Sequence, residues 1–129
     1  MDRDVLLKIP AFAKLDPKEL DEVATWANQA SVSEGSIIVN EGEYSYTFFA
    51  IEDGKAEVVQ HGDKVAELGP GDFFGEIGLI EKEKRNATVR ALTPMRLVTL
   101  TSWDLRRLQK DAPNAHAQIT KVLEERKGN

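Results

Sequence analysis

Residues 71–91 read GDFFGEIGLIEKEKRNATVRA, and they are the most informative stretch of the chain. The stretch opens with a turn signal and two apolar anchors, which are Gly71, Asp72, Phe73 and Phe74. Gly75 ends the extended chain where a short helix can start at Glu76. The apolar positions of that helix are Ile77, Leu79 and Ile80. The pattern therefore predicts an extended segment that passes through a glycine into a short helix.

The start of this helix has the properties of an anion site. Its first turn carries unpaired backbone N–H groups, and these donors together with the helix dipole favour an anion. Gly75 and Gly78 have no side chains that would block the approach. Arg85 returns to the same place if the next strand begins at Ala87, and a guanidinium holds a phosphate by two parallel hydrogen bonds. A phosphate group is the predicted ligand.

Glu76 adds a second requirement, because a carboxylate beside an anion is repulsive unless it binds something else. An ionised carboxylate accepts hydrogen bonds, and a ribose 2′-OH supplies the donor. An exposed Glu76–Arg85 ion pair, worth about 0–1 kcal/mol, is the alternative when either residue is taken alone. The ordered combination with the glycines and with Ala87-Thr88-Val89 favours a compact nucleotide.

With these residues the stretch resembles the phosphate-binding cassette of cyclic-nucleotide-binding domains, the family of the bacterial cAMP receptor protein and the protein kinase A regulatory subunit. The matching residues are Phe74, Gly75, Glu76, Ile77, Gly78, Leu79, Ile80 and Arg85, followed by Ala87, Thr88 and Val89. The resemblance implies that Glu76 binds the ribose 2′-OH and that Arg85 binds the cyclic phosphate. It also implies that backbone N–H groups complete the cradle at Ile77, Gly78 and Ala87.

Two positions depart from the family pattern. The family usually has Gly-x-Pro-Arg before the strand, whereas this chain has Glu83-Lys84-Arg85. Asn86 stands where relatives often carry Ala, Ser or Thr, and a Thr there is associated in the family with guanine recognition. An amide serves either purine or the phosphate, so we expect cAMP as the favoured ligand and cGMP as the alternative. No cofactor is expected.

Composition is typical of a single soluble regulatory module. The 129 residues carry a formal net charge of −5, with 17 basic against 22 acidic residues, which argues against a nucleic-acid footprint. There is no cysteine, and His61 and His116 are the only imidazoles, so neither thiolate nor metal catalysis is expected. No signal peptide is expected, because the apolar run after the acidic first residues is too short, and no apolar run approaches the roughly 20 residues of a membrane span. The expected location is the cytoplasm, and the expected protein is not an enzyme.

The flanking regions predict helices. In residues 1–30, the expected elements are a short helix over 2–9 broken at Pro10, a loop over 11–14, and a helix from Pro17 to about Asn28. Asp16 is the predicted N-cap of that helix, with Glu19 three residues later. Leu15 and Leu20 can form the hydrophobic staple around the cap. Residues 102–129 predict a helix after Thr101, a break at 111–113 and a final helix.

Between these regions the pattern changes to short strands and turns. The predicted strands are 36–39, 47–51, 56–60, 64–68, 87–92 and 96–101. The spacing predicts an α+β, mainly β fold, in which a jelly-roll-like β-roll over 31–101 is flanked by N-terminal and C-terminal helices. Val58, Val65 and Ala66 would line the pocket wall against the base, and ordinary core packing explains them equally well. We expect one domain over residues 1–129.

Three classes of function fit a roll of this kind: a cyclic-nucleotide sensor, a degenerate interaction domain, and a cupin-type enzyme. The cupin is excluded because its metal site needs several histidines and carboxylates that converge in the barrel, whereas His61 is expected on a hairpin and His116 in the last helix.

The last helix carries an apolar stripe formed by Ala115, Ile119, Val122 and Leu123. The resemblance implies that this helix closes over the purine or pairs with another subunit, and simple packing on the barrel explains the stripe equally well. Transcription factors of the family that the chain resembles carry a helix-turn-helix after the C-terminal helix, and residues 1–129 leave no room for one, so we expect no direct DNA binding. We expect either that the chain acts through an effector protein or that it is the sensor part of something longer.

Overall fold

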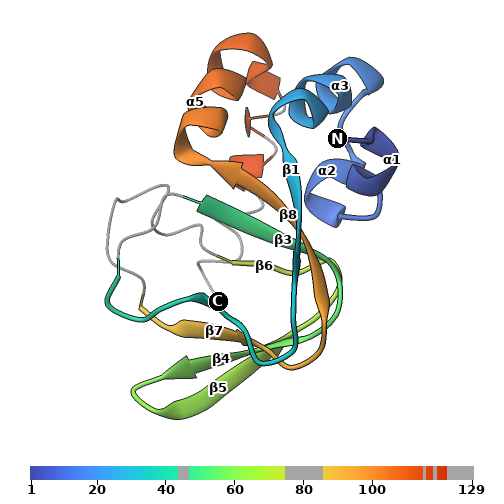
Figure 1. Ribbon diagram of the computed structural model, residues 1–129. Coiled ribbons are helices and arrows are strands. Elements are labelled where there is room, and N and C mark those ends of the chain that lie inside the picture. Colours follow the sequence, from blue (N-terminus) through green and yellow to red (C-terminus); the bar gives the residue numbers. More distant parts are fainter. Residues whose placement is uncertain (44–46, 75–85, 115, 118, 122–129) are drawn as a thin grey trace.

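The computed structural model describes residues 1–43, 47–74, 86–114, 116–117 and 119–121. Its helices gather at one end of the molecule, and two antiparallel sheets extend away from them (Figure 1). The helices are α1 (Arg3–Leu6), α2 (Pro10–Ala13), α3 (Pro17–Trp26) and α5 (Ser102–Asp111). The predicted fold class, a mainly β roll with flanking helices, is confirmed.

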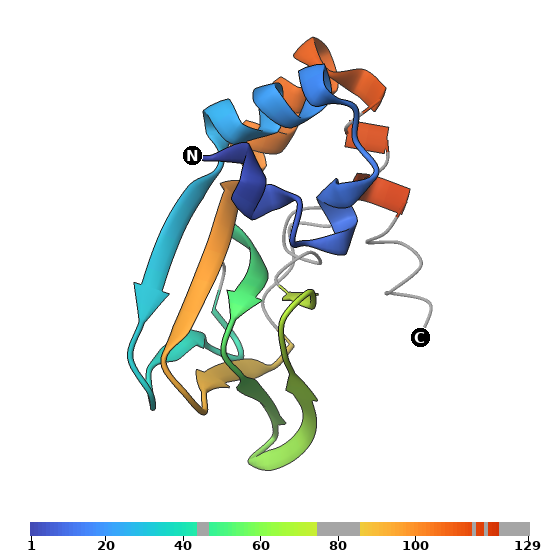
Figure 2. The same cartoon turned by 90° about the vertical axis from the view of Figure 1, so that its right-hand side faces the viewer.

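Each sheet has four strands. The first sheet, called sheet A, has the order β1-β8-β3-β6, and the second, sheet B, has the order β2-β7-β4-β5. The strands are β1 (Asn28–Val32), β2 (Ile37–Val39), β3 (Thr47–Asp53), β4 (Ala56–Gln60), β5 (Asp63–Leu68), β6 (Phe73–Phe74), β7 (Thr88–Ala91) and β8 (Met95–Thr101). The turned view shows the helices stacked on the end of the two sheets (Figure 2).

The start of α3 was predicted correctly. The Asp16 carboxylate accepts from the backbone N–H of Glu19, and the Glu19 carboxylate accepts from the backbone N–H of Asp16, which is a complete capping box. Leu15 and Leu20 on either side of the cap are buried. The helix ends at Trp26, earlier than expected, because Ala27 is extended with ψ 147°.

Residues 11–14 were wrongly predicted to be a loop. The helix predicted over 2–9 already ends at Leu6, so Pro10 is not what ends it; Pro10 is the first residue of α2. A proline suits that position because its missing N–H would have no partner inside the helix. The fully buried Phe12 on α2 then reaches the core beneath the helices.

Two strands were not predicted. β1 is polar at Asn28, Gln29 and Ser31, and it forms the edge of sheet A through a continuous antiparallel register with β8. An edge strand with exposed faces shows little apolar alternation. β6 has only two residues, Phe73 and Phe74, which pair with Ala50 and Phe49 of β3.

Sheet A separates two hydrophobic clusters. The helix-side cluster lies between sheet A and the helices and includes Leu6, Phe12, Val23, Phe48, Phe73, Leu100, Leu108 and Ile119. The roll-side cluster lies between the two sheets and includes Val39, Ile51, Ala56, Phe74, Val89, Ala91, Met95 and Leu97. Alternation along β3 and β8 sends successive side chains to opposite clusters.

The far end of the roll is closed by two turns in direct contact. Gly54, in the turn between β3 and β4, has φ +95°, and a Cβ there would lie 2.5 Å from the carbonyl oxygen of Pro94. The Thr93 Oγ1 accepts from the backbone N–H of Lys55 at 3.0 Å, which ties the same two turns together. Among the described residues, no helix is long and apolar enough to span a membrane.

Candidate functional site

The strand that leads into the predicted cassette is anchored by two phenylalanines. The Phe73 ring lies 5.7 Å from the Phe48 ring in the helix-side cluster. The Phe74 ring stacks on Phe49 in the roll-side cluster, with centroids 5.0 Å apart and planes 15° apart. Because these side chains point to opposite sides of sheet A, the backbone immediately before Gly75 is fixed from both sides.

The turn before β6 is equally well defined. The Asp72 carboxylate accepts from the backbone N–H of Gly69 at 2.8 Å, and Ile51 of β3 exchanges backbone hydrogen bonds with Gly71 and Asp72. Gly71 has φ +91°, and a Cβ there would lie 3.3 Å from Cδ of Pro10. The entry to the cassette therefore packs closely on the start of α2.

The chain that leaves the predicted cassette enters sheet B. Asn86 is exposed, Ala87 is half-buried, and β7 begins at Thr88 between β2 and β4. Val89, the second residue of β7, is buried in the roll-side cluster together with Phe74. Both described ends of the cassette therefore meet the same apolar interior.

Val58 and Val65 occupy different environments. Val58 is half-buried against the roll-side cluster and lies in register with both Val89 and Ala66. Val65 is 56% exposed, and the β4–β5 register shifts beside it, between Val58 and Val59. Val58 therefore faces the interior of the roll, whereas Val65 lies at a bulge of the outer hairpin.

The predicted site residues are thus only partly placed. Phe74 and Val58 belong to one cluster, and Asn86 and Ala87 lie at the start of β7. Gly75, Glu76, Ile77, Gly78 and Arg85 lie outside the described residues. Their assigned contacts, like the roles of the described residues, stay predictions.

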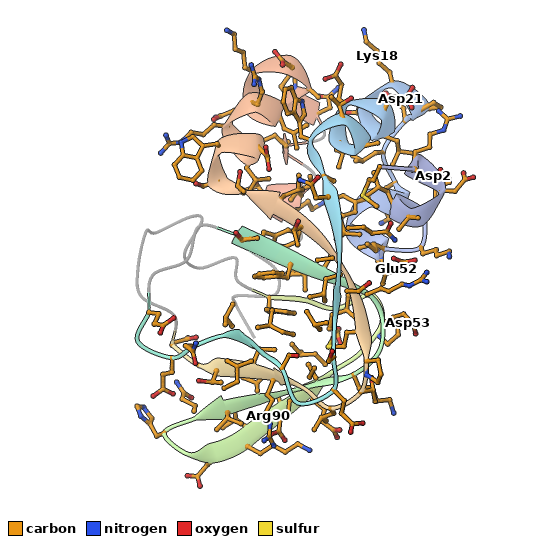
Figure 3. All side chains as sticks on the ribbon, viewed as in Figure 1. Asp2, Lys18, Asp21, Glu52, Asp53 and Arg90 are labelled. Atoms are coloured by element: carbon orange, nitrogen blue, oxygen red, sulfur yellow. The ribbon has the colours of Figure 1, made fainter. Side chains whose placement is uncertain are left out.

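The outer face of sheet B is polar. Glu57 is 8% exposed, and its Oε1 accepts from Nε of Arg90 at 2.9 Å and also from Nη2. Figure 3 shows Arg90 on the side of sheet B that faces away from sheet A. A groove on this face is lined by Glu41, Glu57, Val59, Gly62, Lys64, Thr88 and Arg90. Since these residues alternate with the inward-facing Val58 and Val89, the groove lies on the opposite face of sheet B from the roll interior.

Sequence reasoning missed the link between Glu41 and Thr88. The backbone N–H of Glu41 donates to Oγ1 of Thr88 at 3.0 Å, across 47 positions of the chain. No local pattern identifies a hydrogen bond between residues so far apart. Among the described residues, no group of three or more His, Cys, Asp or Glu side chains is arranged to hold a metal ion.

Comparison with known proteins gives a family match over most of the chain. Residues 29–112 match the model of the cyclic nucleotide-binding domain. The cAMP-dependent protein kinase regulatory subunit of Schizosaccharomyces pombe is 37% identical over 109 residues, which are 84% of this chain and 26% of that protein. A cyclic nucleotide-gated potassium channel of Mesorhizobium japonicum is 36% identical over 120 residues, covering 93% of this chain and 33% of the channel.

A solved structure agrees with these relatives. The regulatory domain of Toxoplasma gondii PKA, crystallised with cAMP, superposes with a TM-score of 0.79 at 26% identity, covering 95% of this chain and 48% of that one. The chain spans about a quarter to a third of the length of the two curated relatives. The match includes both sheets and α5, and so the chain belongs to the cyclic nucleotide-binding domain family.

Proposed function

We propose that this chain is a regulatory sensor domain that binds a cyclic nucleotide, cAMP in preference to cGMP. The observation that carries the proposal is the placement of the cassette ends. Phe74 and Val89, on either side of residues 75–85, pack in one cluster with Val58, so both described ends of the cassette border the roll interior. A nucleotide held there has an apolar wall for its base.

In the proposed complex, two charged side chains bind different groups of the nucleotide. Arg85 takes the cyclic phosphate through its planar donor fork, and Glu76 accepts from the ribose 2′-OH. The backbone N–H groups of Ile77, Gly78 and Ala87 complete the phosphate cradle. These groups bind and orient a ligand and carry out no reaction, so we propose a binding domain and not an enzyme.

Calorimetric titration of the nucleotide-free protein with cAMP and with cGMP tests the proposal. We expect heat with both nucleotides and a lower Kd for cAMP. Tighter binding of cGMP would reverse the assigned preference and would point to Asn86 as a guanine contact. Absence of heat with both nucleotides would overturn the binding function and favour an interaction domain that keeps only the fold.

We also propose that the helices transmit the signal. α5 packs on α3, and Leu108 and Ile119 from the C-terminal region are buried in the helix-side cluster. A helical segment that gains contacts only in the bound state shifts its population when ligand binds. Amide exchange over residues 113–127 should slow at saturating cAMP, whereas unchanged protection there would confine the response to the roll.

The proposed partner of the domain is an effector protein or domain that receives the signal. One curated relative is named as a kinase regulatory subunit and the other as a channel, so an effector protein or domain is the expected receiver of the signal. A homodimer through the C-terminal helix is the second arrangement that suits its apolar stripe. The proposed location is the cytoplasm.

A further inference from the structure

Glu41 joins two segments that are remote from it in the sequence. Its backbone N–H donates to Oγ1 of Thr88 at 3.0 Å. Its Oε1 accepts from the backbone N–H of His61 at 2.9 Å, and its Oε2 lies 3.5 Å from Nδ1 of the same histidine. His61 is at the tip of the β4–β5 hairpin, so Glu41 ties this hairpin to the first residue of β7.

The Glu41–Thr88 hydrogen bond stands where strand pairing stops. On the β4 side, Thr88 is in register with Val59. On the β2 side, the last paired residues are Val39 and Val89, so Thr88 has no register partner among residues 37–39 of β2. The β2–β7 register is already shifted between Ile37 and Val39. The Thr88 hydroxyl therefore continues the connection between β7 and the β2 end after the regular strand pairing has ended.

We propose that the Thr88 hydroxyl is a positioning group for the anion cradle, an inference that rests on the proposed function. Asn86 and Ala87 precede Thr88 directly, and the Ala87 N–H is one of the proposed phosphate donors. A donor that is already held in place costs less conformational entropy when the ligand binds. Releasing the start of β7 lowers the fraction of molecules in the binding-competent arrangement, and the apparent affinity falls by that fraction.

The hairpin gives this connection a rigid support. His61 has φ +53°, a left-handed conformation that is uncommon for a residue other than glycine. The Glu41 carboxylate accepts the N–H of this strained residue. Glu41 therefore connects its own turn to the β4–β5 hairpin and to the start of β7. Of the residues in this connection, Thr88 is the closest in sequence to the proposed anion cradle.

Substitution of Thr88 tests the proposal. Thr88→Val removes the acceptor but keeps the branched shape that suits a strand, and Thr88→Ser keeps the hydroxyl. Thr93→Val is the matched control, because the Thr93 Oγ1 accepts from the backbone N–H of Lys55 at 3.0 Å at the other end of β7. We would measure the Kd for cAMP by calorimetry and, without nucleotide, the amide exchange of Ala87 and Thr88.

We expect Thr88→Val to raise the Kd about three- to tenfold, the equivalent of one neutral hydrogen bond, and to speed exchange at Ala87 and Thr88. Thr88→Ser should keep both quantities within about twofold of wild type. Thr93→Val should leave both unchanged, although it removes an equivalent acceptor and also the hydrogen bond that the Thr93 hydroxyl donates to the Pro94 carbonyl oxygen. Equal behaviour of Thr88→Val and Thr93→Val would make Thr88 an ordinary strand residue. If wild type gives no heat with either nucleotide, the proposed function fails, and the exchange rates alone still decide whether Thr88 fixes the start of β7.

Discussion

The consecutive residues Phe48 and Phe49 of β3 occupy two contrasting sides of sheet A. Phe48 points to the helices and meets Phe73 at 5.7 Å, with the rings tilted by 42°. Phe49 points into the roll and stacks on Phe74 at 5.0 Å. Phe48 is fully buried, whereas Phe49 is only half-buried. The same residue type thus serves a closed core on one side and a more open one on the other.

This difference separates stability from binding. On the helix side, fully buried side chains from α1, α2, α3 and α5 cover the sheet, among them Leu6, Phe12, Val23 and Leu108. On the roll side, the set of buried residues among those described is smaller, and it is bordered by half-buried apolar residues, which include Val32, Ile38, Phe49, Val58 and Leu68. The helix-side cluster also has half-buried neighbours, which are Met1, Val5, Trp26 and Leu105, beside its larger set of buried residues. We therefore expect changes on the helix side to lower the free energy of unfolding, and changes on the roll side also to weaken nucleotide binding.

The largest expected effect belongs to Phe48→Ala. Removal of a fully buried aromatic ring leaves a cavity and should lower the free energy of unfolding by about 3–5 kcal/mol. The Kd for cAMP, measured at a temperature where the variant stays folded, should change less than about threefold. Denaturant titration and calorimetry give the two quantities. Phe48→Leu serves as the milder variant, and a tenfold change in Kd with Phe48→Leu would show that the two sides are not separable.

Arg85→Ala should have the opposite profile. Truncation leaves the phosphate charge poorly compensated, at a cost of about 2–5 kcal/mol in binding, which is a tens- to thousands-fold rise in Kd. The Tm of the nucleotide-free protein should change little. In that state we expect Arg85 to lie beside N–H donors with no anion to bind, so its removal costs the fold no favourable contact. Thermal melts with and without saturating cAMP measure both effects.

Lys84→Ala is the matched control for Arg85, since Lys84 contributes only a point charge from the neighbouring position. Its Kd should stay close to that of wild type. An Arg85→Ala protein that keeps the full rise in Tm with cAMP, or that fails to fold, would make Arg85 a structural residue and place the phosphate elsewhere.

Glu76→Gln isolates the proposed ribose contact. The change leaves the 2′-OH imperfectly paired and should weaken cAMP binding by about 1–3 kcal/mol. The 2′-deoxy analogue of cAMP lacks this hydroxyl, so its Kd should be much less sensitive to the substitution. Calorimetry with both ligands on both proteins completes the cycle. Equal losses for the two ligands would assign Glu76 a structural role.

Phe49→Ala should give the smallest effect and sharpen the contrast with Phe48. Because Phe49 is only half-buried, we expect a loss of about 1–2 kcal/mol in the free energy of unfolding, less than for a fully buried ring. Phe49 supports Phe74, the residue before Gly75, so the Kd for cAMP should rise about three- to tenfold, as expected for loss of one aromatic pair. A larger loss of stability than in Phe48→Ala, with an unchanged Kd, would contradict the division between the two sides.

Local signals in the sequence predicted much of the fold. The start of α3 follows from Asp16, Pro17 and Glu19, which satisfy their hydrogen bonds within one turn. Alternating apolar runs located β2, β3, β4, β5, β7 and β8 to within a few residues. β1 and β6 were missed because β1 is polar and β6 is short, and both owe their conformation to a partner strand.

The candidate site is less accessible to such reasoning. The cassette motif identified the family, which the match over residues 29–112 confirms. The roles of Glu76 and Arg85 stay predictions. The environment of Val65 depends on a bulge in the β4–β5 pairing, and the Glu41–Thr88 bond depends on how the turn at Glu41 meets the start of β7. Neither has a counterpart in local sequence spacing.

The close approach of Gly54 to Pro94 limits which substitutions the protein can accept at position 54. Every codon change that replaces a glycine introduces a Cβ, and here that atom would lie 2.5 Å from a backbone oxygen that belongs to the opposite turn. Gly35, Gly42 and Gly62 also have positive φ, yet each faces open space, where asparagine is a workable substitute. In a library of random variants selected for folded protein, position 54 should therefore stay invariant while those three positions exchange glycine for asparagine.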